Sequence, residues 1–198
     1  MSKSHIAARF VKWGAVPAAV ALAGGLIWQS SYSAFSATTT NPGNSWAAGT
    51  VELTDDDSGA ARFDVTGMTP GQTASKCIAV TSTGSSPATV KLYSANEVKT
   101  KALDTQIQLA ITQGTGGSFG DCTGFAPDAT GSDVFDGTLA GFGELETYSS
   151  GVGSWATAGD TDGETKTYKI TYTFDGSADN AYQGGTAGVD FVWEAQNS

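Results

Sequence analysis

The chain has 198 residues and a net charge of −10, with 20 acidic against 10 basic side chains. A surface of this sign repels phosphate backbones and anionic lipid, which argues against nucleic acid or a membrane surface as a partner. The length is sufficient for one domain with a hydrophobic core of its own.

The first 33 residues have the features of a secretory signal peptide. Lys3, Arg9 and Lys12 form a basic head, and an uncharged apolar run follows over residues 14–27. This run has 14 residues, whereas a membrane-spanning helix needs about 20. We therefore predict a helical signal peptide that is removed, with an uncleaved anchor as the alternative.

Cleavage is expected between Ser33 and Ala34. This cut leaves Ser31 and Ser33 at positions −3 and −1, where small residues are required. The mature chain would have 165 residues and a net charge of −13, because the signal peptide contains three basic residues and no acid. Any contact with the membrane is expected only through the uncleaved signal peptide.

Residues 34–45, directly after this cut, form a polar, Thr-rich segment of extended character. The core strands are expected to begin only at about Thr50. Without further information, a frayed terminus is the ordinary interpretation of such a segment.

The mature chain is dominated by apolar residues that alternate with polar ones at a period of two, which is typical of half-buried strands. Strands are expected over residues 50–54, 61–66, 74–81, 88–92, 107–111, 167–174 and 189–193. A short helix is expected within residues 137–148. Residues 114–136 and 149–163 are rich in Gly, Asp, Ser and Thr, so we interpret them as long surface loops.

The pattern predicts an all-β fold, a single-domain sandwich over residues 46–198 of the immunoglobulin or jelly-roll kind. Cys77 and Cys122 are the only cysteines. An even number of cysteines in an exported chain predicts a disulfide bond between them. Free thiols, or half of a metal site, are the weaker alternative, because neither CxxC spacing nor a neighbouring histidine accompanies them.

Catalytic chemistry is restricted by the absence of histidine from the mature chain, since the single histidine is His5. This excludes a His-based zinc site and a Ser-His-Asp triad. Residues 116–120 match the nucleophile-elbow pattern, but only as a chance match in a Gly-rich loop. A glycosidase that uses paired acids stays open, although no pair is marked. We predict no enzyme, no cofactor and no metal site.

Two acidic clusters, residues 55–57 and 160–164, have the oxygen ligands that calcium prefers, but not EF-hand spacing. Charged turns are the favoured interpretation of both clusters.

Several segments resemble the TasA and camelysin family, in the order that the family shows. Residues 31–36 (SYSAFS) and 45–53 (SWAAGTVEL) resemble its opening, and residues 67–71 (GMTPG) and 80–85 (VTSTGS) resemble two of its turns. Near the C-terminus, YQGG at 182–185 and VDFVWEA at 189–195 resemble its closing strand. The resemblance covers roughly residues 31–93 and 164–195, and the middle of the chain does not match.

The resemblance implies export through a SipW-type signal peptidase and a jelly-roll protein of the cell surface or biofilm matrix. It also implies fibres that form by donor-strand complementation, in which the N-terminal segment of one subunit completes a sheet of the next. The donor residues would be Ala34, Phe35, Ala37 and Thr39, with Phe35 as the anchor. The partner would be the chain itself, together with other surface or matrix proteins. The metallopeptidase activity ascribed to camelysins is not expected, because histidine ligands are missing.

The main alternative is a monomeric secreted module that binds a glycan or a protein through residues 114–136 and 149–163. In that case Trp155 would stack on a sugar, unless it belongs to the core.

Overall fold

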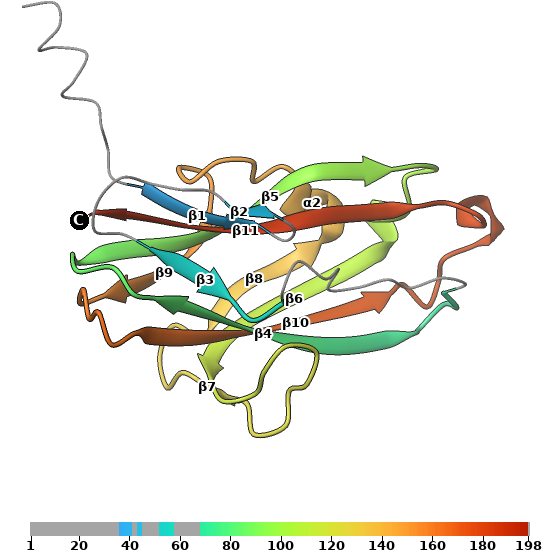
Figure 1. Ribbon diagram of the computed structural model, residues 1–198. Coiled ribbons are helices and arrows are strands. Elements are labelled where there is room, and N and C mark those ends of the chain that lie inside the picture. Colours follow the sequence, from blue (N-terminus) through green and yellow to red (C-terminus); the bar gives the residue numbers. More distant parts are fainter. Residues whose placement is uncertain (1–35, 41–42, 45–51, 58–67, 198) are drawn as a thin grey trace, which may run out of the picture. The chain divides into compact units, whose positions relative to one another are not determined.

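The computed structural model describes residues 36–40, 43–44, 52–57 and 68–197. These residues form two β-sheets of antiparallel strands, joined by loops and short helical turns (Figure 1). Period-two alternation explains this arrangement, because successive side chains of a strand point to opposite faces of its sheet. The all-β sandwich predicted from the sequence is confirmed.

Sheet A has the strand order β2-β1-β11-β5-β9. Its strands are β1 (Ser36–Thr40), β2 (Gly43–Asn44), β5 (Ala88–Lys99), β9 (Val152–Thr157) and β11 (Ala187–Asn197). The long strands β5 and β11 pair along most of their length, with a register shift between Gly188 and Asp190. They form the centre of this sheet.

Sheet B has the strand order β3-β4-β10-β6-β7, and β8 also pairs with β6. Its strands are β3 (Leu53–Asp55), β4 (Thr73–Ser82), β6 (Ile107–Thr115), β7 (Ala126–Pro127), β8 (Asp133–Thr138) and β10 (Glu164–Phe174). The helical segments are the 3-10 turns η1 (Leu103–Gln106) and η2 (Asn180–Tyr182) and the short helix α2 (Leu139–Gly143).

The core lies between the two sheets. Tyr168 of β10 and Trp193 of β11 are both buried, and their ring centroids are 5.3 Å apart across the sandwich. Phe142 of α2 is completely buried and lies 5.2 Å from both Phe135 and Phe191, measured between ring centroids. The helix α2 therefore closes one part of the core with an aromatic cluster.

The strands expected near residues 74–81, 88–92, 107–111, 167–174 and 189–193 are present as β4, β5, β6, β10 and β11, and α2 lies within the expected helical region. β3 overlaps the strand expected at 50–54. The strand expected at 61–66 lies outside the described residues.

The prediction of two uninterrupted loops was wrong, because residues 114–136 contain β7 and the start of β8, and residues 149–163 contain β9. These strands are short, and Gly and Asp interrupt their alternation. Their pairing depends on contacts with β5 and β6 that the local pattern does not reveal.

Candidate functional site

The N-terminal strand β1 lies along β11 of its own chain in antiparallel register (Figure 1). The register runs from Ser36 opposite Gln196 to Thr40 opposite Val192. The predicted donor residues Ala37 and Thr39 lie opposite Ala195 and Trp193. Ser33, Ala34 and Phe35, to which cleavage and anchoring were assigned, lie outside the described residues.

This pairing differs from the expectation that core strands begin at about Thr50. The run of threonines favours an extended, pleated backbone. Without a partner, the β11 edge would also leave a row of N–H and C=O groups unpaired. Sequence alternation identifies such a strand but does not indicate which edge it covers.

β11 depends on β1 for one of its two neighbours. On its other side it pairs with β5 from Asn197 back to Ala187. The side chains of Trp193 and Ala195, at the centre of the segment that β1 covers, are completely buried in the core. The segment of β11 that β1 covers is therefore an integral part of the sandwich, and among the described strands it is β1 that makes it an interior strand.

β1 itself has a weak neighbour on its far side. It pairs there with the two-residue strand β2, through Thr39 opposite Asn44 and Thr40 opposite Gly43. The backbone pairing of β1 with β11 is thus longer than its pairing with β2. Such an edge arrangement suits a strand that can pair with an equivalent edge elsewhere.

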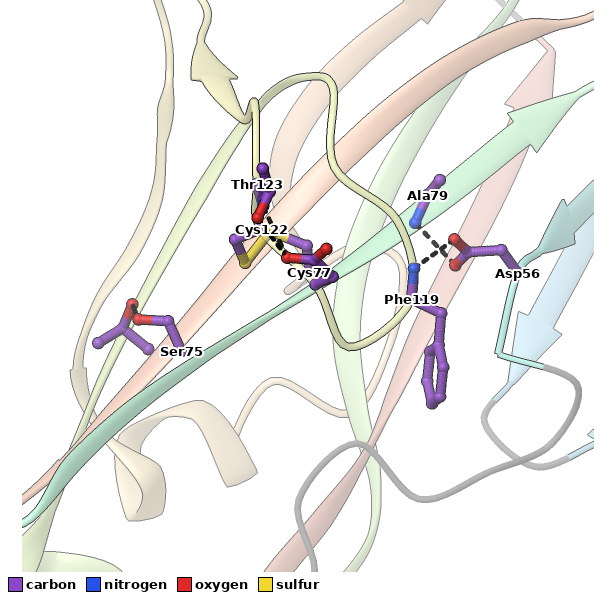
Figure 2. The surroundings of a disulfide bond; sticks show 9 residues. Asp56, Ser75, Cys77, Ala79, Phe119, Cys122 and Thr123 are labelled. Atoms are coloured by element: carbon purple, nitrogen blue, oxygen red, sulfur yellow. Dashed lines mark hydrogen bonds between the residues drawn. A yellow bond between two sulfur atoms is a disulfide. The ribbon is translucent and has the colours of Figure 1, made fainter.

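The predicted disulfide between Cys77 and Cys122 is confirmed (Figure 2). Cys77 lies in β4 and is completely buried, and Cys122 lies in the loop between β6 and β7. The Gly120 N–H donates to the Cys77 carbonyl at 2.9 Å, which holds the same loop against β4. A bridge of this kind fits an oxidising compartment outside the cytosol.

Asp56, directly after β3, reinforces the disulfide region (Figure 2). Its carboxylate accepts hydrogen bonds from the Ala79 N–H at 2.9 Å and from the Phe119 N–H at 2.6 Å. The first donor belongs to β4 and the second to the disulfide loop. This aspartate of the first acidic cluster therefore joins three segments of the chain.

The second acidic cluster is also part of a turn. The Glu164 carboxylate accepts from the N–H groups of Ala158 at 2.8 Å, Gly159 at 3.1 Å and Asp160 at 3.3 Å. Asp160 in turn accepts from the Asp162 N–H at 2.9 Å. Among the described residues, no group of three acidic, histidine or cysteine side chains is arranged to hold a metal ion.

The nucleophile-elbow match at residues 116–120 is not a strand-to-helix turn. It belongs to the disulfide loop, in which Ser118 and Asp121 exchange backbone hydrogen bonds. Trp155, considered as a platform for a sugar, is buried in the core and pairs through its backbone with Val90.

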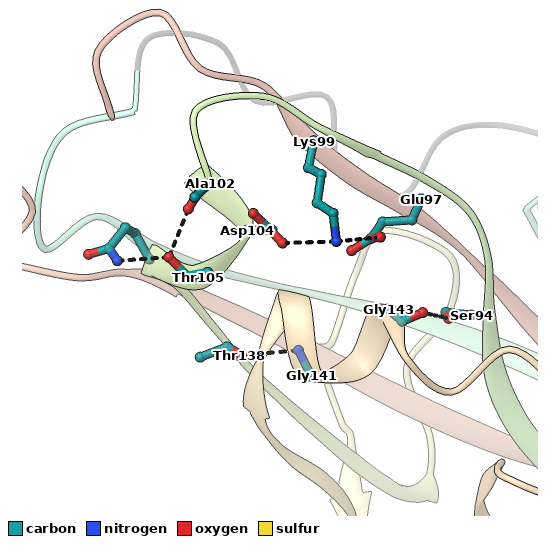
Figure 3. Close-up of polar contacts among 10 residues, drawn as sticks. Ser94, Glu97, Lys99, Ala102, Asp104, Thr105, Thr138, Gly141 and Gly143 are labelled. Carbon is teal, nitrogen blue, oxygen red and sulfur yellow. Dashed lines mark hydrogen bonds and ion pairs between the residues drawn. The ribbon is translucent and has the colours of Figure 1, made fainter. Parts of the chain in front are cut away.

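Figure 3 shows a further polar cluster at the end of β5. The Lys99 ammonium lies 2.7 Å from Glu97 Oε2 and 3.6 Å from Asp104 Oδ2. Its hydrogen bond to Glu97 raises the pKa of Lys99 above the ordinary value. Asp104 is buried in η1, so this cluster ties the end of β5 to that turn.

Comparison with protein-family models and with curated proteins yields no match for this chain. No helix in the described part of the chain is long and apolar enough to cross a membrane.

Proposed function

We propose that the mature protein is a structural subunit of the cell surface or biofilm matrix that self-assembles into fibres by exchanging its N-terminal strand. The observation that carries the proposal is the pairing of β1 with the edge of β11. A strand that completes its own sheet can complete the identical sheet of a second copy with the same register. When each subunit donates to the next in a head-to-tail manner, the assembly stays open and grows as a filament.

The free-energy balance makes such an exchange feasible. Ordering a strand costs about 1–2 kcal/mol per residue, and a ladder hydrogen bond contributes about 0.5–1.5 kcal/mol. These terms are nearly equal within one chain and between chains, because the backbone contacts are the same. Protein concentration and the contacts of residues 34–35 would then decide which arrangement dominates.

The resemblance to the TasA and camelysin family supports the same proposal from the sequence. It assigns export to the signal peptide and the anchor role to Phe35. N-terminal sequencing of the secreted protein tests the export step, with Ala34 expected as the first residue.

A cysteine pair distinguishes exchange between chains from pairing within one chain. Ala37→Cys with Ala195→Cys puts two thiols on directly opposed residues. Opposed residues of antiparallel strands have Cα atoms about 4.5–5.5 Å apart, within the range that a disulfide spans. Thr81→Cys with Thr165→Cys, an opposed pair between β4 and β10, is the matched control.

The mature double variant is allowed to assemble and is then oxidised and analysed by non-reducing electrophoresis. We expect the first pair to give a ladder of covalent multimers and the control pair to give linked monomers only. If fibres form and the first pair also gives only monomers, strand exchange is wrong. If the native mature protein stays monomeric at every concentration tested, the fibre proposal itself is wrong.

A further inference from the structure

A shallow hollow of about 460 Å³ lies on the outer face of sheet A, away from the core. Its floor is formed by Tyr93 of β5 and by Glu194 and Gln196 of β11. Its wall is the loop after α2, which contributes Glu146 and Tyr148. Glu194 and Gln196 pair through their backbones with Thr38 and Ser36 of β1, so the hollow lies beside that strand. The register is the same whether β1 comes from the same chain or from a second copy, so the ligand of the hollow is distinct from the partner in fibre assembly.

The floor of the hollow is held in one arrangement by its own hydrogen bonds. The Tyr93 hydroxyl donates to Glu194 Oε2 at 2.8 Å, and Gln196 Nε2 donates to Glu194 Oε1 at 2.8 Å. Both carboxylate oxygens of Glu194 are thereby oriented. A site fixed in advance loses less conformational entropy when a ligand binds.

The wall is fixed in a similar way. The Tyr148 hydroxyl donates to the Thr89 carbonyl at 3.0 Å, and the Lys91 ammonium lies 5.1 Å from the centre of the Tyr148 ring. The Thr147 and Ser149 hydroxyls hydrogen-bond to each other at 2.9 Å. The loop therefore presents its aromatic ring in a defined position beside the floor.

These internal bonds use most of the donors of the hollow and leave acceptors available to a ligand. Both tyrosine hydroxyls already donate to protein oxygens. The ionised side chains of Glu146 and Glu194 have acceptors only. A ligand that fits this surface must therefore be rich in donors. Positive charge on it would be favoured by the two carboxylates, which outnumber the single Lys91 ammonium beside the Tyr148 ring.

We propose that the hollow binds an amino-sugar glycan, a chain of glucosamine-type units whose amines are free and protonated. Its hydroxyl and ammonium groups would donate to Glu194 and Glu146, and the C–H face of a sugar ring would lie on a tyrosine ring. A basic peptide strand fits less well, because β5 and β11 are paired on both sides and offer no free edge for backbone hydrogen bonds.

Calorimetric titration of the mature protein with a glucosamine pentasaccharide tests this assignment, at mildly acidic pH and physiological ionic strength. We expect saturable binding that weakens about tenfold in Glu194→Gln, the loss of one charge-assisted contact. The Asp133→Asn variant removes the same charge from an exposed position on β8 and should bind as the wild type does. Circular dichroism checks that both variants are folded.

Three results would overturn the proposal. The first is the absence of binding. The second is equal weakening by Glu194→Gln and Asp133→Asn, which would assign the binding to the net charge of the protein. The third is equal affinity for the fully N-acetylated pentasaccharide or for a lysine pentapeptide, because a site for free amino sugars must discriminate against both.

Discussion

At the scale of single residues, Cys77 and Tyr168 show how far burial determines behaviour. Cys77 has no exposed surface, and its partner Cys122 comes from a loop whose position depends on this bond and on Asp56. Tyr168 keeps only 2% of its surface exposed, in the centre of the sandwich. Each residue therefore makes stability depend on one solution condition, the redox potential for Cys77 and alkaline pH for Tyr168.

Reduction of the disulfide should destabilise the domain. The bonded cysteines are 45 positions apart, and closing a loop of that size contributes about 4 kcal/mol through the entropy of the unfolded chain. For a domain of this length we expect a fall in melting temperature of roughly 8–16 °C. Calorimetry with and without reductant measures it. A Cys77→Ser, Cys122→Ser variant should not respond to reductant, and free alkylation of the native protein would contradict the bond.

Alkaline pH should destabilise the protein through Tyr168. Burial, with a smaller contribution from the Asp128 carboxylate, raises the pKa of Tyr168 well above its ordinary value of 10.0. Above pH 10 the unfolded chain releases this proton while the folded chain keeps it, so the free energy of unfolding falls as pH rises. The Tyr168 contribution is constant below that pH.

The test is urea unfolding over a series of alkaline pH values. In Tyr168→Phe the slope of unfolding free energy against pH should be smaller by about 1.4 kcal/mol per pH unit above pH 10, the value for one proton. Equal slopes for the two proteins would show that the Tyr168 phenol ionises in the folded state.

At the scale of elements, β1 differs from the long strands of the two sheets. It consists of small residue types, and its outer neighbour β2 has only two residues. It has the composition SATTT and lies between β11 and the two-residue β2. Its backbone pairs with β11 along all five residues. A bulky anchor next to the strand would increase the affinity of the exchanged arrangement, and Phe35 is the residue in that position of the sequence.

Substitution of this anchor should prevent assembly without unfolding the subunit. Burial of a phenylalanine in a neighbour contributes about 1.5–3 kcal/mol, and Phe35→Asp replaces it with a charge that must be desolvated. We expect no fibres by electron microscopy and an unchanged circular dichroism spectrum. Thr38→Ser, within the same strand, should assemble nearly as the wild type does. Normal fibres from the Phe35→Asp protein would exclude an anchor role for this residue.

At the scale of the whole molecule, the net charge affects how subunits approach one another, and assembly would repeat each surface feature along the polymer. The predicted mature chain has a net charge of −13, so that identical copies repel one another. A polymer of such subunits would also repeat the hollow of sheet A once per subunit. Weak sites in a fixed array bind a long glycan with much higher avidity than one site does.

Salt should accelerate assembly for this reason. Raising the ionic strength from about 0.01 M to 0.15 M shortens the Debye length from about 30 Å to 8 Å and weakens the repulsion between subunits. We expect a shorter lag phase in light scattering, with chloride salts of sodium and potassium equally effective. Slower assembly at higher salt would mean that attraction between charges, rather than strand pairing, brings the subunits together.

The sequence predicted much of the fold because strong alternation is a local property. The apolar residues of β4, β5, β6, β10 and β11 indicated by their spacing which side chains are buried, and the two cysteines of a chain predicted to be exported favoured a disulfide over free thiols. The weaker strands β7, β8 and β9 were missed, since Gly, Asp and Pro interrupt their pattern and their stability comes from partners distant in the chain.

The sequence alone determined the strongly alternating strands and the absence of histidine after residue 33, and it predicted the bridge between Cys77 and Cys122 that the structure confirms. Only the tertiary structure decided which edge β1 covers and that Tyr93, Tyr148 and Glu194 meet in one hollow. The physical reason is that the alternation within a strand specifies which of its residues point to the buried face of the sheet. The neighbouring strand with which it pairs depends instead on which of all the strand edges in the folded chain gives the most stable pairing.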